Sequence, residues 1–201
     1  YVPFLATLEE ADFYSGLGEV VKLHIMGGAD RVSQLIGILP RIKQREPEAL
    51  AMAVQNSLQI KLSYMAGDEF DTGRRNLLNF GHCFGHALES VSNYAVPHGQ
   101  AVVIGMLFAN IAARNRRVLS TILCDYLAKE LLLNAITVSV SHSDLASDRI
   151  IGAMEKDKKR VGKGLPIVLM KDDYTFEKVL DFTQGELVTA LEELQEVAKV
   201  S

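Results

Sequence analysis

The sequence predicts a mainly helical domain with one small β hairpin near its C-terminal end. Only five prolines interrupt the 201 residues, at positions 3, 40, 47, 97 and 166. The stretches between them carry apolar residues at the three-to-four residue spacing that is typical of helices. Two short apolar runs, 165–170 and 176–182, have the length and composition of paired strands.

The elements follow from this pattern in chain order. Helices are expected at residues 8–26, 29–38 and 47–65, and the turn-rich segment "DEFDTG" at 68–73 then forms a loop. A fourth helix is expected at 76–92, and the segment up to Pro97 ends it. Four further helices complete the prediction, at 98–116, 119–133, 143–155 and 184–198.

The chain reads as one domain, residues 1–201, without repeats, low-complexity tracts or an internal linker. It begins "YVPFLATLEE", without a methionine and without the basic-then-apolar pattern of a signal peptide. We therefore expect the domain to be part of a longer protein.

Composition excludes several classes of protein. No long basic run supports nucleic-acid binding, and the formal net charge is −4. No stretch approaches the ~20 apolar residues that span a bilayer. The two cysteines, Cys83 and Cys124, form neither a disulfide framework nor a Cys-x-x-Cys site, which favours a cytoplasmic location.

Three of the five histidines lie within 17 positions, at His82, His86 and His98. On a helix, His82 and His86 would share a face one turn apart, and spacing alone favours them as a pair of metal ligands. A catalytic zinc site typically uses three protein ligands and keeps a position open. The competing interpretation is that these histidines are ordinary surface or core residues.

Charged residues also interrupt apolar segments. Glu19 and Lys22 are three apart in "SGLGEVVKLHI", which fits either a surface salt bridge or a functional pair. Arg75 offers a forked donor for a carboxylate or phosphate, and Asn79 follows it by four residues. The loop "KDKKRVGKG" at 156–164 is either a solvated charge run or a clamp for an anion.

Taken together, these segments resemble the C-terminal domain of 3-dehydroquinate synthase. "SGLGEVVK" is similar to G-x-A-E-V-I-K of that family, and "HGQAVVIGM" to H-G-E-A-V-A-x-G-M. The long segment "DEFDTGRRNLLNFGHCFGHALE" resembles D-E-x-E-x-G-x-R-x-x-L-N-x-G-H-x-x-G-H-A-I-E, and "DKK" before an apolar strand is a fourth match. The matches run in family order from about residue 6 to 170.

The resemblance implies a different set of metal ligands from the spacing. Zn²⁺, or Co²⁺ in the same ligands, would be held by Glu19, His82 and His98. His86 would then handle the substrate phosphate and protons, with Asp71 as a second catalytic residue. The implied substrate-binding residues are Lys22, Lys61, Arg75, Asn79, His86 and Lys158.

The implied reaction converts 3-deoxy-D-arabino-heptulosonate 7-phosphate to 3-dehydroquinate and phosphate, in the shikimate pathway of aromatic amino acid biosynthesis. The family uses NAD catalytically and belongs to the carbon–oxygen lyases. No glycine-rich phosphate cradle is present here, so NAD would be bound by an N-terminal domain outside this chain. The resemblance further implies a homodimeric parent enzyme and little or no turnover by these residues alone.

Two positions depart from the family pattern. Gln100 replaces a glutamate after His98, and losing that charge is expected to weaken the orientation of the ligand. Asp71 replaces a glutamate, which keeps the carboxylate on a shorter side chain.

Three alternatives stay open at this point. One is a sibling sugar-phosphate cyclase, such as an amino-dehydroquinate synthase. The others are a metal-dependent polyol dehydrogenase and a non-catalytic remnant. Arg75 and Asn79, which match a carboxylate pocket, argue against siblings whose substrate lacks a carboxylate.

Overall fold

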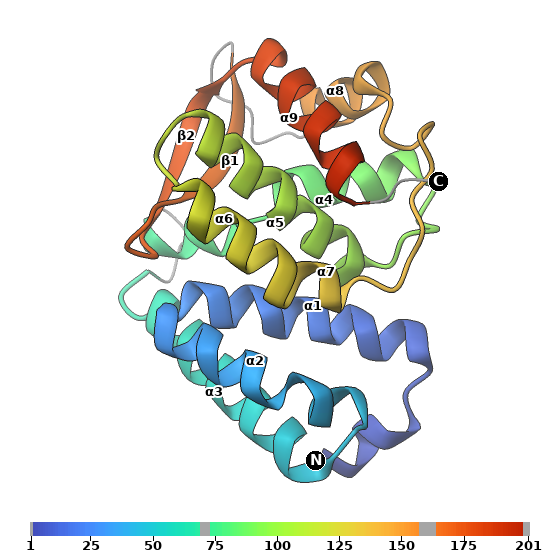
Figure 1. The fold of residues 1–201 in the computed structure, drawn as a ribbon, viewed down its shortest axis with the longest axis vertical. Coiled ribbons are helices and arrows are strands. Elements are labelled where there is room, and N and C mark those ends of the chain that lie inside the picture. The colour runs from blue at the N-terminus through green and yellow to red at the C-terminus, as the bar shows by residue number, and fades with distance from the viewer. Residues whose placement is uncertain (1, 69–72, 157–163, 199–201) are drawn as a thin grey trace.

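The computed structural model describes residues 2–68, 73–156 and 164–198, and confirms a mainly helical domain with one antiparallel strand pair (Figure 1). One end of the molecule holds the 3-10 helix η1 (Val2–Thr7) and the helices α1 (Glu10–Met26), α2 (Ala29–Lys43) and α3 (Pro47–Met65). The other end holds α4 (His82–Val91), α5 (His98–Asn115), α6 (Thr121–Leu127), α7 (Leu133–Ala135), α8 (Ser147–Glu155), α9 (Gln184–Val197) and the strands β1 (Leu165–Met170) and β2 (Phe176–Phe182).

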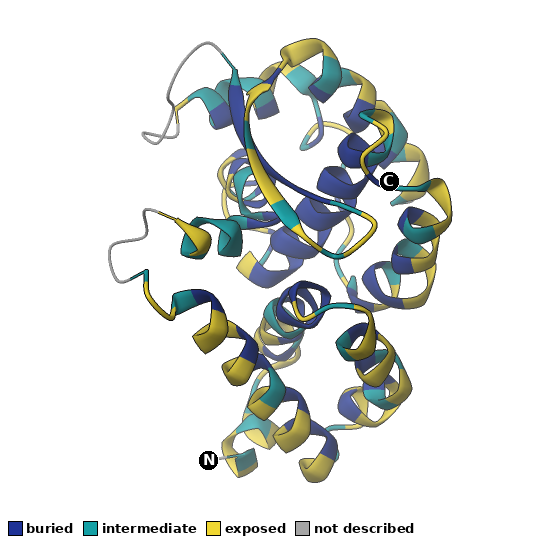
Figure 2. Cartoon of the chain, turned by 90° about the vertical axis from the view of Figure 1, so that its left-hand side faces the viewer, coloured by how far each residue is buried: buried dark blue, intermediate teal, exposed yellow. Residues whose placement is uncertain are grey.

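Helix α5 is the centre of the core. Every residue from Gly99 to Ala113 is buried, and α1, α4, α9 and β1 all pack against it (Figure 2). A helix that is apolar on every side must be covered on every side, which explains its central place. Nevertheless, none of the helices in the described part of the chain is long and apolar enough to cross a membrane.

The hairpin forms where the sequence predicts it. All of β1 is buried against the helices, whereas β2 is mostly exposed on the outside. The register pairs Ile167 with Val179 and Leu169 with Glu177, and it shifts between Leu165 and Ile167. Pro166 lies at this shift, because a proline has no N–H to contribute to the ladder.

The predicted helix at 76–92 is wrong in its first third. Residues Arg74–Asn79 form a separate 3-10 helix, η2, and α4 begins only at His82. Between them Gly81 adopts a φ of +77°, a left-handed conformation that ends one helix and redirects the chain. Arg75 and Asn79 therefore do not share a helix with His82.

Smaller differences concern helix boundaries. Helix α2 continues through Pro40 to Lys43, where the proline lies in the last turn. The segment predicted as one helix at 119–133 consists of α6, a π-helical turn at Ala128–Leu132 and the short α7. The helix predicted from residue 143 begins at Ser147.

Arg116, just beyond the end of α5, joins that helix to β2 and α9. Its guanidinium donates to both carboxylate oxygens of Glu186, at 2.6 and 3.0 Å, and to Oδ1 of Asp181 at 2.9 Å. Glu186 also closes the capping box of α9 with Thr183. Hydrogen bonding to Arg116 lowers the pKa of Glu186 to about 2 from its ordinary 4.5.

This lowered pKa predicts how stability falls in acid. A carboxyl group whose folded-state pKa is depressed stabilises the fold above its unfolded pKa and loses that contribution as pH falls. Glu186→Gln should therefore lower the free energy of unfolding at pH 6 and flatten its decline between about pH 4.5 and 2. Urea denaturation across this range measures both, with the exposed Glu192→Gln on α9 as the control. Parallel curves for the wild type and Glu186→Gln would contradict the assignment.

Candidate metal centre

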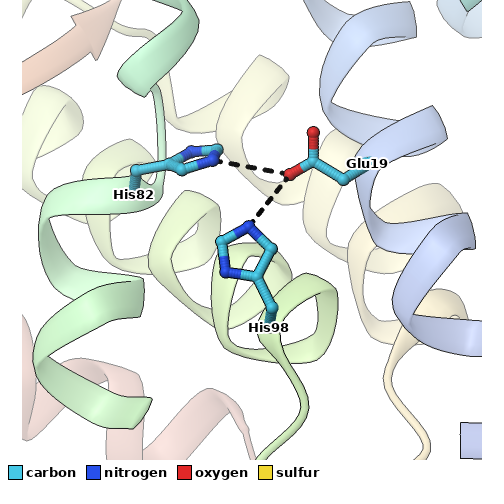
Figure 3. Close-up of side chains that lie close together, drawn as sticks. All are labelled: Glu19, His82 and His98. Carbon is cyan, nitrogen blue, oxygen red and sulfur yellow. Dashed lines mark ion pairs between the residues drawn. The ribbon is translucent and has the colours of Figure 1, made fainter. Parts of the chain in front are cut away.

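Glu19, His82 and His98 bring three metal-binding atoms together from three helices (Figure 3). Oε1 of Glu19 lies 3.5 Å from Nε2 of His82 and 3.6 Å from Nε2 of His98. One ligand atom from each residue lies within 4.8 Å of the other two. The side chains point toward one another in the space between α1, α4 and α5.

Both histidines are the first residues of their helices. His82 follows Gly81 at the start of α4, and His98 follows the extended Pro97 at the start of α5. At the start of α4, the positive end of the helix dipole disfavours an imidazolium at His82 and so favours the neutral, metal-binding form of that ring.

Helix α1 approaches the start of α5 so closely that no side chain fits between them. A Cβ on Gly18 would lie 2.2 Å from the carbonyl oxygen of Gly99, and a Cβ on Gly99 would lie 1.7 Å from that of Ser15. Ser15 also accepts a hydrogen bond through Oγ from the Gly99 N–H at 2.9 Å, which satisfies a free donor of the α5 terminus. This contact places Glu19 beside His98.

Helix α4 is fixed to α5 in the same manner. A Cβ on Gly105 would lie 2.0 Å from the carbonyl oxygen of Gly81. Gly81 must also hold its left-handed φ, so both a side chain and a different backbone conformation are excluded there. As a result, His82, the first residue of α4, lies next to the α5 backbone.

His82 is neutral at physiological pH. Burial and the nearby charge of Lys22 lower the pKa of His82 to about 4. Its Nδ1 lies 3.2 Å from the carbonyl oxygen of Phe80, which can only accept, so the ring proton belongs on Nδ1. The lone pair on Nε2 therefore faces Glu19.

The two oxygens of Glu19 have different surroundings. Oε2 accepts a hydrogen bond from the buried Lys22 ammonium at 2.8 Å, whereas the buried Oε1 has no hydrogen-bond partner among the described residues. Burial raises the pKa of Glu19, but the charge and hydrogen bond of Lys22 outweigh it, so the pKa is lowered overall. Lys22 also lies 3.4 Å from Nε2 of His82, and burial lowers the pKa of its ammonium.

These donors fit a divalent metal ion. Two imidazole nitrogens and one carboxylate oxygen form the N, N, O set that catalytic zinc uses with an open fourth position. A buried carboxylate oxygen without a hydrogen-bond donor is costly, and a cation facing it would remove that cost. The structure therefore groups His82 with Glu19 and His98, rather than with His86 as spacing favoured.

His86 lies beside this group without joining it. Its ring is exposed and stacks on that of His98 with centroids 5.7 Å apart. A pocket of about 120 Å³ opens next to it, lined by Asn79, His82, Cys83, His86, Pro166, Ile167, Val168 and Lys178. Asn79 and His86 thus share a pocket with one candidate metal ligand.

The remaining predicted residues are placed on neighbouring elements or not described. Arg75 is on η2 with Asn79, and its N–H donates to Oδ2 of Asp68 at 2.8 Å. Lys61 is exposed on α3, and its charge contributes to lowering the pKa of Lys22. Asp71 and Lys158 lie outside the described residues.

Gln100 does not orient His98. Its Nε2 donates to the carbonyl oxygens of Tyr14 and Ala135, both at 3.0 Å, and its Oε1 accepts from the N–H and hydroxyl of Thr137. Four hydrogen bonds saturate a primary amide, so this buried side chain fastens α5 to α1, to the end of α7 and to the segment that follows α7. A glutamate carboxylate at position 100 would face the carbonyl oxygens of Tyr14 and Ala135, to which it has no N–H to donate.

Two residues near the site escaped sequence analysis. Glu89 accepts a hydrogen bond from Nδ1 of His98 at 3.1 Å, and its position two turns after His82 on one helix could have indicated it. Lys178, on β2, lines the pocket and donates to Oδ1 of Asn76 at 3.0 Å. Only the tertiary structure brings Lys178 to η2.

The described residues thus form a helical domain in which a two-histidine, one-carboxylate group lies beside a buried lysine and a pocket lined by a second lysine. Comparison with known families identifies the class of this domain. The family model for the C-terminal domain of 3-dehydroquinate synthase matches residues 16–160, and the chain belongs to that family.

Similar proteins include enzymes named 3-dehydroquinate synthase. One from Dehalococcoides mccartyi (strain ATCC BAA-2266 / KCTC 15142 / 195) is 34% identical over 95% of this chain and 53% of its own length. One from Methylococcus capsulatus is 40% identical over 83% of this chain and 46% of its own length. The chain thus spans about half the length of these relatives.

Solved structures share the fold at lower identity. The 2-epi-5-epi-valiolone synthase ValA of Streptomyces hygroscopicus subsp. jinggangensis, solved with NAD⁺ and Zn²⁺, aligns with a TM-score of 0.81 and 24% identity over 97% of this chain and 54% of its own. A 2-deoxy-scyllo-inosose synthase, solved with carbaglucose-6-phosphate, NAD⁺ and Co²⁺, aligns with a TM-score of 0.71 and 17% identity over 97% of this chain and 55% of its own.

The contact between Gly18 and Gly99 predicts that one added methyl group lowers both the stability of the fold and its affinity for zinc. Gly18→Ala should lower the free energy of unfolding by about 3 kcal/mol, because the α5 backbone cannot yield, and should weaken zinc binding by moving Glu19. Gly16→Ala on the same helix is the matched control, since a Cβ there meets nothing within 4 Å. Urea denaturation and zinc titration measure both variants. Equal stability of the two would show that the helices are free to separate.

Proposed function

We propose that this chain is the metal- and substrate-binding half of a 3-dehydroquinate synthase. The reaction would convert 3-deoxy-D-arabino-heptulosonate 7-phosphate to 3-dehydroquinate and phosphate, as a step of aromatic amino acid biosynthesis. The observation that carries the proposal is the convergence of Glu19, His82 and His98 beside the buried Lys22. Family membership supports the same assignment.

In this proposal Glu19, His82 and His98 hold Zn²⁺ or Co²⁺. When bound, the metal and NAD would supply Lewis-acid and reversible hydride chemistry to the substrate. The neutral state of His82 and the ionised state of Glu19 suit both residues to ligation at physiological pH. Only a deprotonated ring nitrogen or carboxylate binds a metal.

The cationic and polar residues around the metal ligands would bind the substrate. Lys22 is buried at 4% exposure and stays beside Glu19, so it can donate to a substrate oxygen next to the metal ligands. His86, exposed at the pocket, is placed to hold a phosphate oxygen and exchange a proton with solvent. Asn79 and Arg75 would hold the carboxylate, with Lys61, Lys158 and the catalytic Asp71 completing the set.

The NAD site is proposed to lie in a separate half of the enzyme, outside these residues. The family relatives are about twice as long as this chain, which leaves room for such a half. Metal ligands and half of a substrate site would give the 201 residues little or no turnover by themselves. The enzyme would act as a homodimer in the cytoplasm.

A sibling cyclase is the alternative that an observation favours. Both solved relatives described above carry names of cyclases other than 3-dehydroquinate synthase. The same fold and metal site would serve such a reaction, and the groups facing the substrate carboxylate decide between them. The pair Arg75 and Asn79 supports a substrate that has one.

Phosphate release tests the proposal directly. It is measured with the heptulosonate phosphate, NAD⁺ and Zn²⁺, for the 201 residues alone and for the same residues within a full-length enzyme. We expect turnover only in the full-length protein and its loss in His82→Ala, with the exposed His142→Ala as the control. Undiminished turnover in His82→Ala would contradict the metal assignment. Phosphate release only from a seven-carbon sugar phosphate without a carboxylate would favour the sibling.

Variants of Arg75 and of its neighbour Arg74 distinguish the loss of carboxylate recognition from the loss of a positive charge in general. Arg75→Leu should lower kcat/KM for the carboxylate-bearing substrate roughly 10- to 150-fold, the equivalent of a charge-assisted hydrogen bond of about 1.5–3 kcal/mol. Arg74 lies over the ring of Tyr64 at 4.5 Å, so Arg74→Leu should change stability more than kcat/KM. Steady-state kinetics in the full-length enzyme compare the two. Equal losses in kcat/KM would remove Arg75 from the carboxylate site.

A further inference from the structure

The His98 ring faces a different carboxylate with each of its nitrogens. Nε2 lies 3.6 Å from Oε1 of Glu19, and Nδ1 lies 3.1 Å from Oε2 of Glu89. The Glu89 side chain is only 13% exposed, although that of His98 is 44% exposed. A well-shielded carboxylate therefore holds Nδ1 of a ring that is itself partly exposed to solvent.

The hydrogen bond between His98 and Glu89 matters for metal binding because it determines which imidazole nitrogen carries the proton. A neutral imidazole has one N–H and one lone pair, and an ionised carboxylate can only accept. In the neutral ring, the hydrogen bond to Glu89 places the proton on Nδ1 and leaves the lone pair on Nε2, facing Glu19. For His82 the carbonyl oxygen of Phe80 has the same effect, at 3.2 Å from Nδ1.

The fold explains why Glu89 can reach His98. His82 and Glu89 are seven residues apart on α4, so both lie on the face of that helix that is turned toward the start of α5. One helix thereby supplies a candidate ligand and the partner of another ligand. Because the backbones of α4 and α5 are in close contact at Gly81 and Gly105, packing sets the separation of the two helices that carry Glu89 and His98.

We propose that Glu89 is a positioning residue, which fixes the tautomer and orientation of His98 so that Nε2 faces the metal position. This inference rests on the proposed function of Glu19, His82 and His98 as metal ligands. Carboxylates that hold the far nitrogen of a ligating histidine typically change metal affinity 10- to 100-fold. Without Glu89, the exposed His98 ring would be free to rotate and to exchange tautomers.

A second cation site is the competing explanation for the same residues. His86, Glu89 and His98 also offer ligand atoms within 4.8 Å of one another. With Nδ1 of His98 as its ligand atom, that site would need a lone pair there, whereas the 3.1 Å contact with Glu89 is a hydrogen bond that needs a proton on the same nitrogen. A neutral ring cannot present lone pairs on both sides, so the geometry favours positioning.

Zinc affinity and stoichiometry test the proposal in the 201-residue protein. Competition with a chromophoric chelator gives the Kd for Zn²⁺ in the wild type, Glu89→Ala, Glu89→Gln and Glu89→Asp. We expect one zinc per chain throughout, a Kd raised 10- to 100-fold in Glu89→Ala, a smaller rise in Glu89→Gln, and partial recovery in Glu89→Asp. Glu192→Gln, an exposed charge change on α9, should leave the Kd within twofold of the wild type.

A measurement of the His98 tautomer distinguishes a positioning role of Glu89 from a purely structural one. Long-range ¹H–¹⁵N spectra of the metal-free protein should show His98 protonated on Nδ1 in the wild type and as a mixture of tautomers in Glu89→Ala. His98→Gln assigns the signals, and thermal unfolding of each metal-free variant checks that the fold is retained.

The remaining outcomes overturn the proposal in distinguishable ways. Wild-type zinc affinity in both Glu89→Ala and Glu89→Gln would overturn this inference alone. Two zinc ions in the wild type and one in Glu89→Ala would make Glu89 a ligand instead. Absence of zinc binding by the wild type would overturn the proposed metal site, and this inference with it.

Discussion

The contact of α1 with the start of α5 leaves no room for a side chain, and the geometry of the site depends on it. Gly18 lies against Gly99, and Ser15 on the neighbouring helix α1 caps the start of α5. Helix backbones that meet without intervening side chains are held at a distance set by hard atomic contacts, which do not compress. Glu19 is one residue from this contact, and His98 is one residue from it on the other helix.

The same constraint recurs between α4 and α5, and the two contacts together define the candidate centre. Three ligand atoms converge because the starts of α4 and α5 and the middle of α1 pack against one another. In the first turn of α5, the buried amide of Gln100 adds hydrogen bonds to α1, to the end of α7 and to the segment after it. The glutamine, expected to be a weakness, is a fully satisfied element of this framework.

Electrostatics at the centre follow from burial as much as from the residues themselves. Lys22 is the buried cation that holds one oxygen of Glu19, and its charge helps to keep His82 neutral. The other Glu19 oxygen faces the two Nε2 atoms and has no hydrogen-bond partner among the described residues, which is unfavourable unless a cation is bound there. The site therefore favours the binding of a cation at this oxygen, beside a pocket lined by His86 and Asn79.

The sequence by itself determined the helical class, the hairpin and the residues of the candidate centre. Apolar periodicity and sparse prolines are local signals, and so they located α1, α3, α5 and both strands. Spacing alone, however, paired His82 with His86, because it treated 76–92 as one regular helix. Only the family resemblance placed Glu19 and His98 beside His82.

Tertiary structure decided the rest, for reasons that local sequence does not contain. The left-handed turn at Gly81 separates η2 from α4, and its cause is a backbone on α5, 24 residues away in the chain. The pairing of Glu89 with His98, the partners of Gln100 and the arrival of Lys178 at the pocket all depend on how helices pack. Such contacts join residues on separate helices and strands, and the packing of those elements sets them.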